Sequence, residues 1–368
     1  MNSKPHFLLL DALRGIAAFF VLWYHVFEAF CTSAIDQRFN HAYLAVDFFF
    51  ILSGFVIGYA YDNRWGKMST GQFFKRRLIR LHPMVIMGAA LGVITFFIQG
   101  GVQWDGTKTA LPMVAVAFLL TICMIPAIPG SGPEIRGNGE MFPVNGPTWS
   151  LFFEYIGNIL YALFVRRFST KALKILVAVT GAGLAVFAVG NLSGAGHIGV
   201  GWSLLEHNFL GGMLRMGFSY SAGLLLSRVF KPRRIKGAFW ICLLAMGILF
   251  TMPHLGGERL WINGIYDTFC VLVAFPAILC IGACGSAESN GTNSFYKLLG
   301  ELSYPVYIIH YPFMYLYYAW VWKNGLTFAQ TWYVAVGIIA GSIILAYIIL
   351  KLYDQPVRKY LSKRYNNF

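Results

Sequence analysis

A small set of ionisable side chains lies within long apolar stretches of this 368-residue chain. A charged side chain in a bilayer-spanning helix is costly and usually faces the protein interior, so each one is a candidate for function. Together they supply cations for an anionic ligand, and carboxylates and imidazoles for proton transfer. They are Asp11, Arg14, His25, Glu28, Asp47, Glu154, Arg215 and His310.

The first pair of interest is Arg14 and His25, which are eleven residues apart. In an α-helix this spacing places them within about 20° of one direction and ~16 Å apart along the axis. Asp11 falls near the same stripe, and Glu28 follows His25 by one turn, so either carboxylate could orient the imidazole. A cation and a base on one face suit a ligand that extends across the membrane. A snorkelling arginine and a buried, hydrogen-bonded histidine are the alternative interpretation.

A second pair, Arg77 and Arg80, lies in a basic segment that we expect to be a cytoplasmic loop before the third span. Because the two residues are three apart, they would share one helix face and present two guanidinium groups to a polyanion. Arginine suits phosphate because its planar group donates paired hydrogen bonds. The alternative is an ordinary cluster of basic residues at the cytoplasmic boundary.

A third group begins at Pro147, which is well tolerated in the first turn of a helix. Glu154 would then lie within the membrane and need a cationic partner, for which Arg215 is the obvious candidate. Further along the chain, Tyr307 and His310 add two more polar groups to an apolar stretch. A buried histidine with satisfied hydrogen bonds is the alternative interpretation of His310.

The elements that would hold these residues are membrane helices. The chain is 57% hydrophobic and only 12% charged, whereas about a quarter of the residues in a soluble domain are charged. Many uncharged runs approach the ~20 residues needed to cross a ~30 Å hydrocarbon layer. We predict an all-α polytopic membrane protein with a retained first span. The expected spans lie near 7–31, 42–61, 81–100, 147–165, 173–191, 208–227, 237–253, 265–285, 298–322 and 330–351.

The distribution of basic residues predicts the topology. Lys and Arg gather at 64–80, 166–174, 228–236 and 351–364. All four clusters lie on one side if the apolar run 110–128 dips into the membrane without crossing it. We therefore expect about ten transmembrane helices, one possible re-entrant or extra helix, and both termini in the cytoplasm. The net charge of +14 then indicates anionic lipid headgroups rather than nucleic acid.

Residues 1–353 are expected to form one transmembrane domain, and residues 354–368 a short basic cytoplasmic tail. The six cysteines mostly lie in apolar runs, and no spacing suggests a zinc site, so no metal is expected.

Five stretches, in order along the chain, resemble the membrane-bound acyltransferase-3 family. The basic residue and histidine of the family's first span match Arg14 and His25, and its Arg-x-x-Arg motif matches Arg77 and Arg80. The stretches are LDALRGIAAFFVLWYHV (10–26), AVDFFFILSGFVIGY (45–59), FFKRRLIRLHP (73–83), PTWSLFFEY (147–155) and LGELSYPVYIIHYP (299–312). The family's Trp-Ser-Leu-x-x-Glu segment matches Trp149, Ser150 and Glu154.

The resemblance implies an integral membrane O-acyltransferase of the bacterial inner membrane, here without the fused hydrolase-like domain of many relatives. It would move an acetyl group from cytoplasmic acetyl-CoA to a hydroxyl of an extracytoplasmic or lipid-linked carbohydrate. His25 would act as general base or transient acyl carrier, oriented by Glu28 or Asp11. The expected ligands of acetyl-CoA are Arg14, Arg77 and Arg80. The expected acceptor side comprises Trp149, Ser150, Glu154, Arg215, Tyr307 and His310.

Two other functions fit parts of the sequence. A transporter or exporter of an anionic or sugar substrate also needs many spans and intramembrane charges, although no two related halves with broken helices are evident. A membrane glycosyltransferase fits less well because the expected outer loops hold few carboxylates. The acceptor, the acyl chain length, the choice between direct transfer and an acyl-histidine, and the oligomeric state stay open.

Overall fold

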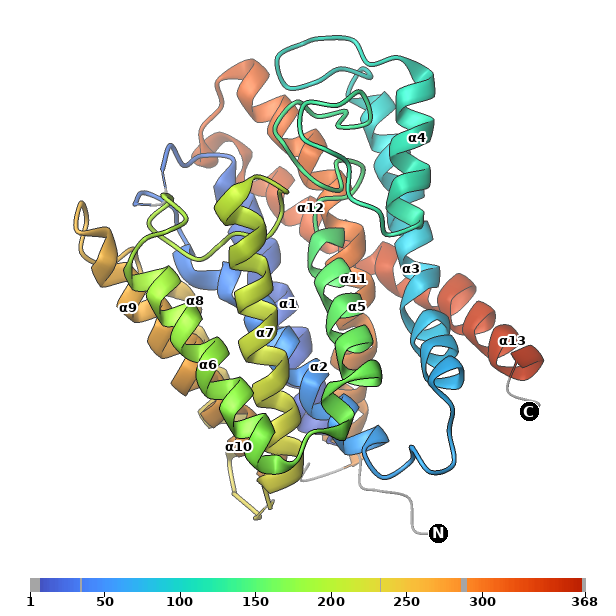
Figure 1. Ribbon diagram of the computed structural model, residues 1–368. Coiled ribbons are helices and arrows are strands. Elements are labelled where there is room, and N and C mark those ends of the chain that lie inside the picture. Colours follow the sequence, from blue (N-terminus) through green and yellow to red (C-terminus); the bar gives the residue numbers. More distant parts are fainter. Residues whose placement is uncertain (1–6, 34, 232, 286–289, 366–368) are drawn as a thin grey trace.

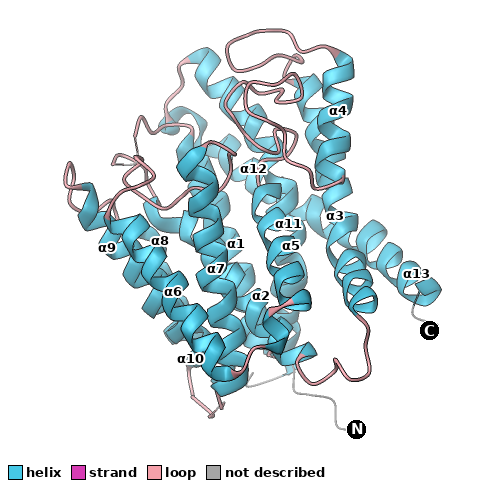
Figure 2. Cartoon of the chain, viewed as in Figure 1, coloured by secondary structure: helices cyan, strands magenta, loops and turns pink. Residues whose placement is uncertain are grey.

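The computed structural model describes residues 7–33, 35–231, 233–285 and 290–365. These residues form helices joined by loops, and none of them belongs to a β-strand (Figure 2). The all-α fold class is therefore confirmed. The α-helices are α1 (Leu8–Glu28), α2 (Ala45–Tyr61), α3 (Thr70–Ile98), α4 (Leu111–Ile122), α5 (Thr148–Leu163), α6 (Thr170–Val189), α7 (Glu206–Val229), α8 (Ala238–Thr251), α9 (Leu260–Phe269), α10 (Phe275–Cys284), α11 (Asn290–Asn324), α12 (Phe328–Ile349) and α13 (Gln355–Tyr365).

Six helical stretches among the described residues are long and apolar enough to cross a bilayer. Two of these contain π-helical turns, Cys270–Ala274 between α9 and α10 and Leu350–Asp354 between α12 and α13. A helix covers each of the ten expected spans, while the number of crossings and the side of the termini stay predictions. The six stretches are Leu8–Glu28, Asn40–Tyr61, Thr70–Ile98, Thr170–Val189, Leu260–Cys284 and Phe328–Tyr365.

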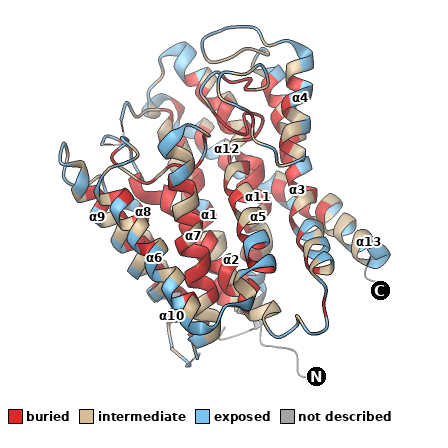
Figure 3. Cartoon of the chain, in the orientation of Figure 1, coloured by how far each residue is buried: buried red, intermediate tan, exposed pale blue. Residues whose placement is uncertain are grey.

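The surface of the helix bundle is suited to lipid. Buried residues gather in the middle of the bundle on α2 and α7, whereas the outward faces of helices such as α6 are exposed (Figure 3). Large apolar side chains project from these faces: Trp240 is 69% exposed and Val179 is 64% exposed. Such apolar outer faces, on helices that satisfy their own backbone hydrogen bonds, are typical of membrane-spanning proteins. The protein is a multi-pass membrane protein.

The apolar run 110–128 contains only the 12-residue helix α4. At 1.5 Å per residue this helix is about 18 Å long, which is short of the ~30 Å hydrocarbon thickness. Figure 1 shows α4 beside the end of α3, with the following loop returning toward the start of α5. The helix is thus too short to cross the hydrocarbon layer by itself, and the path of residues 110–128 through the membrane stays a prediction.

The basic segment that holds Arg77 and Arg80 is helical, so the prediction of a loop there was wrong. Helix α3 begins at Thr70, because Ser69 accepts a hydrogen bond from the Gln72 backbone while the Gln72 side chain accepts one from the Ser69 backbone. Pro83 lies inside α3 without ending it. The two arginines therefore extend from the same rigid helix that forms the third span.

Helices α2 and α7 approach each other closely along two glycines. A Cβ atom at Gly54 would lie 2.1 Å from the carbonyl oxygen of Tyr220, and one at Gly223 would lie 2.1 Å from the carbonyl oxygen of Ile51. Only glycine permits backbones to approach this closely, and small residues are frequent where membrane helices pack. This contact sets the distance between the polar side chains that the two helices carry.

Candidate active site

Two cavities lie at opposite ends of α1. We call the cavity near the start of α1 the inner cavity, and the one near the end of α1 the outer cavity. The inner cavity has a volume of about 330 Å³ and is lined by α1, α2, α3, α5, α11 and the region where α12 meets α13. The outer cavity has a volume of about 260 Å³ and is lined mainly by α1, α11 and loops. Tyr307 and Val46 line both cavities.

His25 lines the outer cavity and pairs with Glu28. Its Nδ1 lies 2.8 Å from Glu28 Oε2. Tyr318 donates its hydroxyl hydrogen to the same carboxylate oxygen at 2.8 Å. Because an ionised carboxylate only accepts hydrogen bonds, Nδ1 carries the proton and Nε2 is left as the basic nitrogen. Nε2 makes no hydrogen bond with any described residue and is available to take a proton from a hydroxyl group.

Asp11, the other carboxylate proposed to orient His25, lies at the opposite end of α1. Its Oδ1 is 3.4 Å from Arg14 Nη2, and both side chains line the inner cavity. Arg14 also donates to Ser303 Oγ at 2.8 Å and to the Gly300 carbonyl oxygen at 2.9 Å. Glu28 is therefore the carboxylate that orients His25, and Asp11 belongs to the surroundings of Arg14.

The expected pairing of Glu154 with Arg215 is wrong. Glu154 Oε1 accepts from Arg77 Nη2 at 2.6 Å and from Ser53 Oγ at 2.7 Å, in the wall of the inner cavity. Arg215 instead contacts both carboxylate oxygens of Asp47 at 2.7–3.2 Å. The close packing of α2 against α7 brings Asp47 to Arg215. Opposite charges in the sequence do not by themselves indicate which carboxylate pairs with Arg215.

Arg215 lines the outer cavity and also stabilises its wall. Its side chain is almost completely buried and also donates to the carbonyl oxygens of Val200 and Tyr43 at 2.7 and 2.9 Å. Its guanidinium carbon lies 5.4 Å from the ring centre of Trp149, within the range of a cation–π contact. Arg215 thus connects α7, α2 and the loop around Val200, and holds Trp149 against the cavity.

Arg77 and Arg80 both line the inner cavity, as expected of a shared helix face, but their environments differ. Arg77 is buried and paired with Glu154, so its charge is already compensated. Arg80 makes no hydrogen bond or ion pair with the described part of the chain. An unpaired guanidinium at the edge of a cavity is well placed to bind an anion.

The two cavities meet near Tyr307, which lines both, and Ser150, which lines the inner one. Their hydroxyl oxygens are 2.8 Å apart. Since Ser150 donates its hydrogen to the Pro147 carbonyl oxygen at 3.0 Å, Tyr307 is the donor between the two hydroxyls. The residues of the segment from Trp149 to Glu154 therefore line two different cavities. Trp149 lines the outer cavity, while Ser150 and Glu154 line the inner one.

His310 lies behind His25 and lines neither cavity. The ring centres of the two histidines are 5.4 Å apart. His310 is fully buried and its Nδ1 is 3.1 Å from the Val306 carbonyl oxygen, four residues earlier in α11. The expected position on the acceptor side is therefore wrong for His310, which forms part of the packing around His25.

Several residues of the outer cavity were not predicted. Tyr311, Tyr315, Tyr318 and Trp322 all line it from α11. Their spacing of four, three and four residues puts them on one helix face, and this stripe was visible in the sequence. The cavity is strongly aromatic as a result. Its other aromatic residues are Tyr24, Tyr43, Trp104, Trp149, Trp202 and Tyr307.

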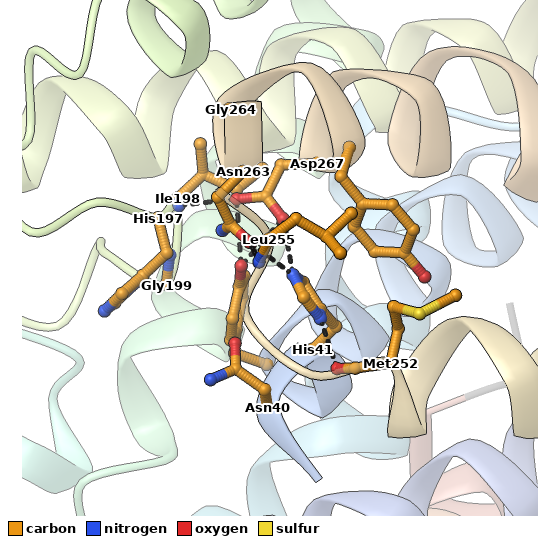
Figure 4. Close-up of polar contacts among 12 residues, drawn as sticks. Asn40, His41, His197, Ile198, Gly199, Met252, Leu255, Asn263, Gly264 and Asp267 are labelled. Atoms are coloured by element: carbon orange, nitrogen blue, oxygen red, sulfur yellow. Dashed lines mark hydrogen bonds and ion pairs between the residues drawn. The ribbon is translucent and has the colours of Figure 1, made fainter. Parts of the chain in front are cut away.

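Tyr43 lines the outer cavity and is held by a buried polar network. Figure 4 shows the part of this network that contains His41, Asn263 and Asp267. Tyr43 donates its hydroxyl hydrogen to the carboxylate of Asp267 at 2.7 Å. Next to it, the two ring nitrogens of His41 lie 2.7 Å from the Met252 carbonyl oxygen and 2.9 Å from Asn263 Oδ1. The network ties the turn before α2 to α9, so that Tyr43 has little freedom to move.

The long segment between α4 and α5 covers the outer cavity and is tightly packed. Its Arg136 is fully buried, with the guanidinium carbon 3.6 Å from the ring centre of Tyr315 and 5.4 Å from that of Trp104. Arg136 Nε donates to the Pro143 carbonyl oxygen at 3.1 Å within the same segment. These contacts make the segment a structured lid over the outer cavity.

Glu140 lines the outer cavity from this lid and gives the protein a pH-dependent stability. Burial raises the pKa of Glu140 to about 7 from 4.5. Its carboxyl group contacts Tyr315 and accepts from Asn138 Nδ2 at 2.8 Å. The folded protein therefore retains a proton that the unfolded chain releases, so the free energy of unfolding should fall by about 3 kcal/mol as pH rises from 4.5 through 7.

Thermal unfolding in detergent between pH 4.5 and pH 8 measures this dependence, with Glu140→Gln as the comparison. The glutamine variant has no proton to release at this position and should lose most of the slope over that range. An unchanged slope in Glu140→Gln would contradict the assignment.

Comparison with known proteins gives two kinds of similarity. The sequence model of a family described as "Acyltransferase domain" matches residues 7–351. "Protein 2 in picA locus" of Rhizobium radiobacter is 34% identical over 199 residues, which cover 51% of this chain and 98% of that protein. "Acyltransferase MdmB" of Streptomyces mycarofaciens is 24% identical over 392 residues, covering 96% of this chain and 92% of that protein. No solved structure matches the chain significantly.

Proposed function

This chain belongs to the acyltransferase domain family, and we propose that it transfers an acetyl group from acetyl-CoA to a carbohydrate hydroxyl across a bacterial inner membrane. The observation that carries this proposal is the pair of cavities that meet at Tyr307. One contains an unpaired cation and the other contains a base. A donor and an acceptor that approach from opposite sides need this arrangement.

The donor would occupy the inner cavity. The phosphate groups of acetyl-CoA would bind Arg80, which has no competing partner in the described chain, while Arg14 and Arg77 add positive potential from positions already held by other contacts. The flexible arm of the donor would pass Ser150 and Tyr307, so that the thioester reaches the side of His25. Paired hydrogen bonds from guanidinium to phosphate favour this orientation.

The acceptor would occupy the outer cavity. A sugar ring has apolar C–H faces that pack on aromatic rings and hydroxyl groups that need polar partners. The outer cavity offers both, because Trp149 and the tyrosines of α11 surround the carboxyl groups of Glu28 and Glu140. These features support a carbohydrate acceptor.

In the reaction, His25 Nε2 would remove the proton from the acceptor hydroxyl as its oxygen attacks the thioester carbon. The Glu28 carboxylate would stabilise the resulting imidazolium through the hydrogen bond to Nδ1. Collapse of the tetrahedral intermediate then expels the CoA thiolate, which takes the proton from the His25 imidazolium. An alternative route, in which His25 first accepts the acetyl group, uses the same atom and the same carboxylate.

Incubation of the purified protein with radiolabelled acetyl-CoA and deacetylated cell-envelope glycans tests the function. Label should appear on the glycan together with free CoA. Uptake of unmodified sugar into vesicles without consumption of acetyl-CoA would contradict the proposal and favour a transporter.

Replacement of Arg80 with glutamine should raise KM for acetyl-CoA by about 10- to 100-fold and change kcat little. The reason is that a hydrogen bond to a charged group contributes about 1.5–3 kcal/mol. Arg76→Gln is the matched control, because Arg76 is exposed on the same helix and does not line the cavity. Steady-state kinetics measures both variants, and equal KM values for the two would contradict the assignment of Arg80.

A further inference from the structure

Helix α13 lies beyond residues 7–351, which match the acyltransferase family, yet it takes part in the inner cavity. The π-helical turn Leu350–Asp354 separates it from α12, and Figure 1 shows α13 turning away to lie beside the start of α3. Asp354 and Arg358 both line the inner cavity. These residues were expected to belong to a separate tail, but the structure makes them part of the cavity wall. A π-helical turn often marks a functional site.

Asp354 has an unsatisfied carboxylate oxygen in this wall. Its side chain is 1% exposed, and Oδ2 accepts from Arg358 Nη1 at 2.9 Å. Oδ1 has no hydrogen-bond partner among the described residues. Leaving a buried charged acceptor unpaired is costly, so a donor supplied by a ligand would recover much of that cost.

The chemistry of that donor is restricted by charge. A carboxylate repels phosphate, and the phosphate groups of the donor molecule would bind Arg80 in the same cavity. The group opposite Asp354 must instead carry N–H or O–H. In acetyl-CoA the candidates are the exocyclic amine of adenine, the ribose hydroxyl, and the amides and hydroxyl of the pantetheine arm.

The position of Asp354 in the cavity favours the adenine. The thioester must lie near Ser150 and Tyr307, where the inner cavity meets the outer one. Asp354 lines the inner cavity from a different element, the π-helical turn between α12 and α13. An extended donor molecule would place its nucleotide end there and its pantetheine arm further inside.

We propose that Asp354 accepts a hydrogen bond from the exocyclic amine of adenine, with Arg358 holding the carboxylate in place, so that α13 selects adenine nucleotides as acyl donors. This inference rests on the proposed use of acetyl-CoA. It assigns a specificity-determining role to a segment outside the family match.

Equilibrium binding of two ligands to the purified protein tests the inference. The ligands are CoA and its deaminated analogue, in which hypoxanthine replaces adenine and a carbonyl oxygen replaces the amine. The wild-type protein should bind CoA about 10- to 100-fold more tightly, because the analogue puts an oxygen opposite the carboxylate. In Asp354→Leu the two ligands should bind within about twofold of each other, and Asp354→Asn should reduce the preference if the leucine variant does not fold.

Glu301→Gln is the control, since Glu301 lines the same cavity but its carboxylate is paired with Lys351 at 3.1 Å. This variant should keep the wild-type preference. Equal binding of the two ligands by the wild-type protein, no binding of CoA, or an unchanged preference in Asp354→Leu would overturn the inference. If the binding results agree while no acetyl group is transferred, the proposed function fails and the adenine site stands.

Discussion

Replacement of His25 with alanine is expected to lower kcat for acetyl transfer by about 10³-fold while the affinity for acetyl-CoA stays within about twofold. General-base catalysis by a positioned histidine contributes roughly 10²–10⁴-fold to a rate. His25 Nε2 is the basic nitrogen left free by the contact between Nδ1 and Glu28. The donor, by contrast, would bind at Arg80 in the other cavity, so its affinity should hardly depend on His25.

Two controls make this result specific. The centre of the His25 ring lies 4.7 Å from that of Tyr311, so removal of the ring leaves a gap that could destabilise the protein. Thermal unfolding shows whether His25→Ala remains folded. Phe19→Ala, on the same helix and 45% exposed, controls for loss of an aromatic ring from α1. A folded His25→Ala variant that transfers acetyl groups at the wild-type rate would eliminate His25 as base or acyl carrier.

Replacement of Arg215 with methionine should destabilise the protein by about 3–5 kcal/mol, the largest effect on stability that we expect. The substitution leaves the buried carboxylate of Asp47 without its cation and two carbonyl oxygens without their donors. Asp47→Leu should also be strongly destabilising for the reciprocal reason. Thermal unfolding in detergent measures both variants.

The double variant Asp47→Leu/Arg215→Met separates the ion pair from simple loss of packing. Removing both charges leaves no uncompensated buried ion, so it should be clearly more stable than the sum of the single changes predicts. Strictly additive effects of the two substitutions would show that the pair makes no coupled contribution to stability.

The parts of the site that follow from one helix alone were predictable. Arg14, His25 and Glu28 lie on α1, and the geometry of a regular helix determines which of their neighbours share a face. The contact between His25 and Glu28 is of this kind, because residues three apart meet across one turn. The aromatic stripe of Tyr311, Tyr315 and Tyr318 obeys the same rule and was missed only because no charge drew attention to it.

Partners on different helices were not predictable in the same way. Arg215 was the expected partner of Glu154, and Arg77 was placed in a loop outside the membrane, because the sequence does not give the distances between residues on different helices. The approach of α2 to α7 at Gly54 decided that Arg215 pairs with Asp47, which left Glu154 to Arg77. The different environments of Arg77 and Arg80 have the same origin, because the packing of α5 against α3 buries one and leaves the other facing the cavity.

In the proposed reaction, the acetyl group crosses from a donor at one end of α1 to an acceptor at the other. Proteoliposomes with the protein in one orientation test this most directly. Radiolabelled acetyl-CoA is placed on the side of the inner cavity and deacetylated glycan on the side of the outer cavity. We predict labelled glycan only when donor and acceptor are on these opposite sides, and none with His25→Ala. Labelling only when both substrates are on the same side would contradict transfer across the membrane.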